Sequence, residues 1–136
     1  MAELQTRKTD PFHYAEYLSR AEQCLNAAKH SASTNEWDAC AINSVQSAIS
    51  AADALTVFCK SERSAGQRHE EAARLFKSIA PQDAPIQENA NRLSRILAKK
   101  NASAYEEKAV KRNEAEYLLV EAGRLLDFVK TRLPRQ

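Results

Sequence analysis

Glycine is almost absent from this chain. Gly66 and Gly123 are the only two among 136 residues, where an average composition would give about 10. β-Sandwiches, barrels and dinucleotide-binding folds need glycine at tight turns and at loops that cradle phosphates. Alanine is the commonest residue, with 24 copies, and it has the highest helix propensity. The composition therefore argues against those folds and predicts one all-α domain over residues 1–136.

The hydrophobic core of such a domain would be thin. Leu, Ile, Val and Phe together number 26, which approaches the low level found in disordered chains. Disorder also requires a high net charge, and a formal charge of +2 does not supply it. We therefore expect a compact helical bundle whose core is completed by a second copy of the chain, forming a homodimer.

The composition also suggests a compartment. Cys24, Cys40 and Cys59 are odd in number and lack metal-finger spacing, so we expect all three to pack in the core of a protein in a reducing environment. Residues 1–10 lack the apolar run of a signal peptide. The longest uncharged run, residues 39–52, is too short and too polar to span a bilayer. These features predict a cytoplasmic protein.

Prolines and capping residues divide the chain into five predicted helices, four long and one short, in the order typical of an up-and-down bundle. They cover about residues 10–30, 36–60, 68–79, 85–104 and 113–133. The expected starting signals are Asp10 with Pro11, a capping box of Ser33 with Glu36, Pro85, and Asn113 as N-cap. The second helix is nearly uncharged and is expected to be covered on two sides. Its predicted buried faces hold Ile42, Val45, Ile49, Ala52 and Thr56, and the small residues Ser44, Ser47 and Ala51.

One lysine departs from the pattern of the fourth predicted helix. At about 100° per residue, Lys100 lies roughly 50° from the centre of the apolar face, whereas Arg92, Arg95 and Lys99 lie on the opposite, solvent-facing side. Tyr105 flanks the apolar stripe on the other side. Two interpretations remain open: Lys100 and Tyr105 belong to a site, or Lys100 extends its amine to solvent and Tyr105 is a rim aromatic.

The same region is basic. Residues 92–112 hold seven Lys and Arg against two Glu, a local charge of +5, so the remaining residues sum to −3. Such a segment favours phosphate-bearing partners. It is equally compatible with a solvated helix whose C-terminal cations oppose the helix dipole. Gly123 lies within the last predicted helix, where a close helix crossing or a dimer contact would explain it.

Four segments of the chain resemble the HEPN family, over about residues 12–133. They are Ala51-Ala-Asp53-Ala-Leu55, Gly66-Gln-Arg-His69, Leu97-Ala-Lys-Lys100-Asn101-Ala-Ser-Ala-Tyr105 and the helix beginning Glu114-Ala-Glu-Tyr. The likeness is to a small single-domain bacterial branch. It implies a helical bundle that dimerises with its motif helices facing each other across a cleft. Similar proteins include metal-independent ribonucleases, often toxins encoded beside a minimal nucleotidyltransferase, and non-catalytic binding modules.

The resemblance also implies a site. The family motif is an Arg, commonly a polar residue such as Asn, and a His four to six residues on; Lys100, Asn101 and Tyr105 occupy these positions here. Tyrosine has a reference pKa of about 10 and is a poor base at neutral pH. Lysine lacks the planar fork of arginine but still contacts phosphate as a point charge. The variant motif therefore favours phosphate binding over hydrolysis.

Two functions remain open at this stage. The first is a module that binds RNA or nucleotide phosphate through a basic cleft, with Lys99, Lys100, His69 and Lys108 as contacts. The second is a metal-independent endoribonuclease or toxin that uses Lys100, Asn101 and Tyr105, paired with a nucleotidyltransferase. Neither interpretation requires a metal or another cofactor.

Overall fold

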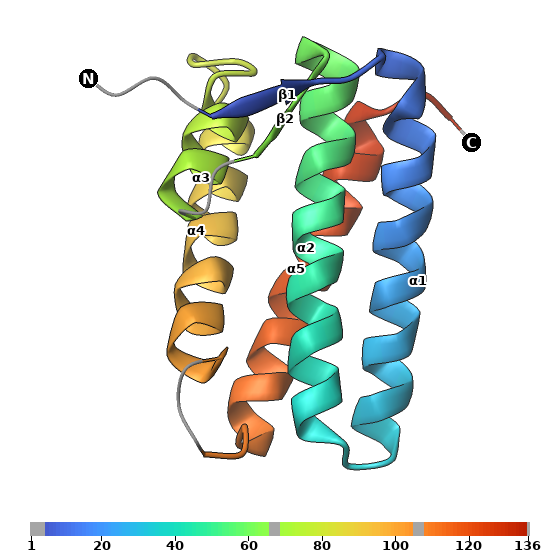
Figure 1. Ribbon diagram of the computed structural model, residues 1–136, viewed down its shortest axis with the longest axis vertical. Helices are drawn as coiled ribbons and strands as arrows, with labels where there is room; N and C mark the ends of the chain where they lie inside the picture. Colours follow the sequence, from blue (N-terminus) through green and yellow to red (C-terminus); the bar gives the residue numbers. More distant parts are fainter. Residues whose placement is uncertain (1–4, 66–68, 105–107, 136) are drawn as a thin grey trace.

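The chain forms a bundle of upright helices with a small two-stranded sheet across one end (Figure 1). The computed structural model describes residues 5–65, 69–104 and 108–135, except for the side chains of residues 69 and 100–104. In chain order the elements are β1 (Thr6–Lys8), a 3-10 helix η1 (Pro11–His13), α1 (Tyr14–Ser33), α2 (Trp37–Lys60), β2 (Glu62–Ser64), α3 (His69–Lys77), α4 (Ala84–Ala104) and α5 (Arg112–Arg132). The predicted fold class, four long helices and one short, is confirmed.

Helix α2 is the central element, and it packs mainly against α1 and α5. Small residues make this possible: Ser44, Ser47, Ala48 and Ala51 are all completely buried. The Ser47 hydroxyl donates a 2.7 Å hydrogen bond to the carbonyl of Ala21 on α1, which satisfies a polar group that burial would otherwise penalise. The prediction that α2 is covered on two sides is confirmed.

The faces of α2 and the positions of two cysteines differ in part from the expectation. Ile42 is 68% exposed, although Val45 and Ala52 of the same predicted stripe are buried. Cys40 is buried as expected, but Cys24 is only half-buried and Cys59 is exposed in the last turn of α2. The prediction of core packing is therefore wrong for Cys59.

Helix boundaries follow the predicted signals except at two N-termini. Asp10 caps the first helical turn by accepting a 2.9 Å hydrogen bond from the Phe12 amide, as expected. The predicted capping box is wrong, because Ser33 is still part of α1 and its hydroxyl bonds back to the His30 carbonyl. Helix α5 begins at Arg112, so the residue at its N-cap is Lys111 rather than Asn113.

The sequence analysis missed the two strands. Residues 62–64, expected within a turn, form β2, which pairs antiparallel with β1 in the register Arg7 to Arg63. Ser61 makes the connection possible by adopting a left-handed conformation with φ of 57° directly after α2. Three-residue strands are too short to carry a period-two pattern, so nothing in the sequence distinguished them from loop.

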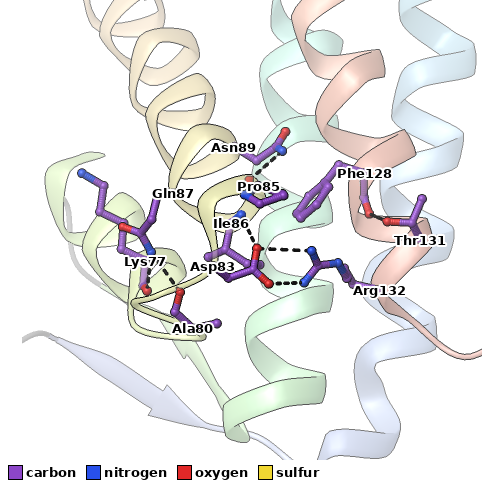
Figure 2. A network of polar contacts seen from close by, with 10 residues as sticks. All are labelled: Lys77, Ala80, Asp83, Pro85, Ile86, Gln87, Asn89, Phe128, Thr131 and Arg132. Carbon is purple, nitrogen blue, oxygen red and sulfur yellow. Dashed lines mark hydrogen bonds and ion pairs between the residues drawn. The ribbon is translucent and has the colours of Figure 1, made fainter.

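Polar contacts hold the start of α4 against the end of α5 (Figure 2). An Asp83 oxygen accepts a 3.1 Å bond from the Ile86 amide, which caps α4 one residue before its first turn. The Arg132 guanidinium donates to both oxygens of Asp83, at 2.8 and 3.2 Å, and these bonds lower the pKa of Asp83. The Gln87 amide donates to the carbonyls of Lys77 and Ala80, joining α3 to α4. These contacts set the direction in which α4 runs toward the other end of the bundle.

Gly123 is not explained by a close crossing within the described part of the chain. A Cβ atom built on this residue, which lies in the interior of α5, would meet none of the described atoms within 4 Å. The dimer contact that the sequence also suggested stays a prediction.

Asp53 is a half-buried carboxyl on α2, near Arg63 of β2 and Arg20 of α1. Burial raises its pKa from 3.8 to about 7, although both arginines act in the opposite direction. Between the pKa of an unfolded aspartate and this value, the folded chain holds a proton that the unfolded chain has lost. The free energy of unfolding therefore decreases as the pH rises through this window.

We expect the protein to be more stable at pH 5 than at pH 8, and Asp53→Asn to remove most of this difference. Each pKa unit corresponds to about 1.4 kcal/mol, so the loss is on the order of 3 kcal/mol. Urea unfolding of both proteins at the two pH values measures it. If the wild type and the variant show parallel pH profiles, Asp53 is not the cause.

Candidate functional site

The C-terminal end of α4, which carries the first two motif residues, lies at the end of the bundle opposite the sheet (Figure 1). Lys100 and Asn101 belong to the last turn of α4, whereas Tyr105 and the side chains of Lys100 and Asn101 lie outside the described residues. His69 is the first residue of α3, which packs against β2 and α4 in the half of the bundle that carries the sheet, and its side chain also lies outside the described residues (Figure 1). Lys108 is exposed in the connection between α4 and α5. The roles of all these residues stay predictions.

The first turns of α2 and α5 complete this end of the bundle (Figure 1). Asp38 in the first turn of α2 accepts a 2.8 Å hydrogen bond from the Val110 amide, which ties down the chain between α4 and α5. The Arg112 guanidinium lies 5.4 Å from the centre of the Trp37 ring. Both contacts join the first turn of α2 to the segment that leads into α5, far apart in sequence.

Lys99 is not an ordinary solvated lysine. Its side chain is exposed, yet its ammonium nitrogen lies 4.9 Å from the centre of the Tyr117 ring on α5. A cation at this distance from an aromatic face is attracted by the ring quadrupole, so the ammonium is partly ordered while its other side faces water. This arrangement presents a positive charge one residue before the motif lysine.

One turn farther along, three arginines surround one carboxylate. Glu121 of α5 is 8% exposed, and its oxygens lie 3.4 Å from Arg92 Nε, 3.6 Å from Arg95 Nη2 and 3.2 Å from Arg124 Nη1. Arg92 is only 15% exposed and also donates a 2.7 Å bond to Asn89. The prediction that Arg92 lies on a solvated face is therefore wrong, because α5 covers that side of α4.

We call this row the α4–α5 seam. It consists of Arg92, Arg95 and Lys99 on α4, and Tyr117, Glu121 and Arg124 on α5. The contacts follow an antiparallel order, with Lys99 opposite Tyr117 and Arg95 opposite Glu121. Four cations face one carboxylate, which leaves an excess of three positive charges. Tyr117, Glu121 and Arg124 are not predicted as site residues from the sequence. They are four and three residues apart, however, which places them on one face of a helix.

Other site types find no support in the described part of the chain. No group of three or more His, Cys, Asp or Glu in residues 5–65, 69–104 and 108–135 is placed to hold a metal ion. None of the helices, over the same ranges, combines the length and apolarity needed to cross a membrane.

Comparisons with known proteins agree with this architecture. The sequence matches the HEPN domain over residues 14–132, and the chain belongs to the HEPN domain family. The fold is similar to that of TT1696 from Thermus thermophilus, with a TM-score of 0.66, 19% identity, and coverage of 89% of this chain and 98% of the other. It is also similar to ST0689, an archaeal HEPN homologue, with a TM-score of 0.62, 21% identity, and coverage of 88% and 96%. No curated protein matches the sequence.

Proposed function

We propose that this protein binds the phosphate groups of RNA or a nucleotide at the basic end of its bundle, without efficient catalysis. The binding groups that we propose at this end are Lys99, Lys100 and Lys108; His69 is a separate predicted contact on α3, which packs against β2. The observation that carries the proposal is the concentration of charge: residues 92–112 hold a net +5 in a chain of +2. Lys99 and Lys108 are exposed there and open to a polyanion.

Membership of the HEPN family supports this choice, because the family includes both RNA-binding modules and ribonucleases. The residues at the motif positions favour binding over cleavage. A lysine replaces the arginine that would grip a phosphate in two places, and Tyr105 replaces a histidine that titrates near neutral pH.

A second candidate function is a metal-independent ribonuclease or toxin that acts with a nucleotidyltransferase partner. It is favoured by the preserved spacing of the motif: Lys100, Asn101 and Tyr105 keep the family pattern at the end of α4. In this case Lys100 would hold the phosphate, and Tyr105 would move the proton of the RNA 2′-hydroxyl after its own pKa is lowered by a nearby cation.

The binding proposal predicts strong salt dependence. We expect the affinity for fluorescein-labelled single-stranded RNA, measured by anisotropy, to fall linearly on a log–log plot against salt. Lys99→Ala with Lys108→Ala should reduce the slope by roughly 0.7 for each phosphate that the protein no longer neutralises. Lys8→Ala is the matched control, since Lys8 is an exposed lysine in β1 at the other end of the bundle. Equal slopes for all these proteins would contradict the proposal.

The choice between binding and cleavage has its own test. We expect purified protein to bind mixed RNAs in EDTA and to leave them intact, because neither motif residue is suited to acid–base catalysis at neutral pH. Gel analysis of the RNA over several hours measures this. Cleavage in EDTA that disappears in both Lys100→Ala and Tyr105→Phe would instead establish the ribonuclease function.

We also propose a homodimer, since the core is thin and no atom in the described part of the chain approaches the Cβ position of Gly123. Gly123→Ala should stabilise the helix by up to about 1 kcal/mol and weaken the dimer if α5 lies at the contact. Light scattering should give twice the monomer mass of 15.2 kDa for the wild type. A monomer mass over a wide concentration range would refute the dimer, and an unchanged dimer in the variant would place Gly123 away from the contact.

A further inference from the structure

The α4–α5 seam carries more positive charge than its one carboxylate neutralises. Glu121 has two oxygens, whereas each guanidinium carries five N–H donors. Arg92 is largely buried and donates to Asn89, and its Nε lies 3.4 Å from Glu121 without a hydrogen bond, whereas Arg124 donates a 3.2 Å hydrogen bond to this carboxylate. Arg95 and Arg124 are 50% and 62% exposed, and each touches Glu121 through one nitrogen at 3.6 and 3.2 Å. Most of their donors therefore point to solvent.

These two arginines are ordered as well as exposed. The carboxylate lies within 3.6 Å of both guanidinium heads, one from each helix, and both heads reach the surface. A guanidinium that is already oriented loses less conformational freedom when it takes up a phosphate, and its planar fork can bind two phosphate oxygens at once.

The seam leads directly to the proposed binding end. Arg95 and Lys99 are one helical turn apart, about 5.4 Å along α4, and Lys99 is adjacent in sequence to Lys100. The row of cations therefore continues from the motif end of α4 back along the helix pair. The cations form a single row, which matches one phosphodiester backbone. A duplex would present two backbones across a wide minor groove.

We propose that the α4–α5 seam is a track for the backbone of single-stranded RNA, in which Arg95 and Arg124 bind phosphates beyond those held at the motif end. Glu121 is a positioning residue that orients both guanidiniums. The track rests on the proposed phosphate-binding function and deepens it by assigning the ligand: a single strand several nucleotides long rather than a mononucleotide.

The test compares two lengths of RNA on the full chain. A uridine trinucleotide is too short to fill both the motif end and the seam, and a uridine dodecanucleotide can fill both. We expect the wild type to bind the longer RNA more tightly. Arg95→Gln with Arg124→Gln should weaken the dodecanucleotide about tenfold and lower its salt slope by roughly 1.4, two phosphates at 0.7 each, while leaving the trinucleotide unchanged.

Two further double variants serve as controls. Arg7→Gln with Lys8→Gln removes the same charge from exposed positions on β1, and it should leave the length dependence intact. Arg95→Lys with Arg124→Lys keeps the charge without the fork, so it should restore the salt slope and only part of the affinity. Thermal unfolding of each variant reports any purely structural effect of the substitutions, which would not change the slope.

The possible failures are distinguishable. If the Arg95 and Arg124 variant binds the dodecanucleotide with wild-type affinity and slope, the track is wrong, while a weakened Lys99 and Lys108 variant would still support phosphate binding at the motif end. If the wild type binds neither RNA, both proposals fall. If polyglutamate binds the seam as tightly as RNA, the occupant is an acidic protein and the RNA track is overturned.

Discussion

The close approach of α1 and α5 to α2 is the constraint on which the rest of the structure depends. Buried alanines and serines on α2 leave little side-chain volume between the helices, so the backbones can come near each other. The hydrogen bond from Ser47 to the Ala21 carbonyl is a direct result of this proximity. A core built from such small residues buries little apolar surface per residue, and burial is the main favourable contribution to folding.

Helix α4 lies beside this central unit and is fastened in part by polar contacts. Asp83 and Arg132 join its start to the end of α5, and the ion pairs of Glu121 join its middle to the same helix. These polar contacts also determine the charge of the surface between α4 and α5. Because α4 and α5 meet through arginines around one carboxylate, the α4–α5 seam carries excess positive charge and leads to the motif end of α4.

Much of the fold followed from the sequence, because helix periodicity depends on neighbours three and four residues away. Val45, Ala52 and Thr56 were predicted to be buried in α2, and all three are. Ile42 was predicted by the same pattern and is exposed, since periodicity identifies an apolar side without showing which helix covers it. The site was predicted less well. Arg92 and Lys99 were assigned to solvent, and their partners Glu121 and Tyr117 come from α5, more than fifteen residues away.

By itself, the sequence determined the helical class, the order of long and short helices, and the concentration of positive charge around residues 92–112. Each of these depends on composition or on local spacing, which tertiary contacts leave unchanged. Only the tertiary structure decided what those charges do. The register of α4 against α5 buries Arg92 with Glu121 while it leaves Arg95 and Arg124 at the surface. Burial and pairing between distant segments are properties of packed helices, and no single helix pattern contains them.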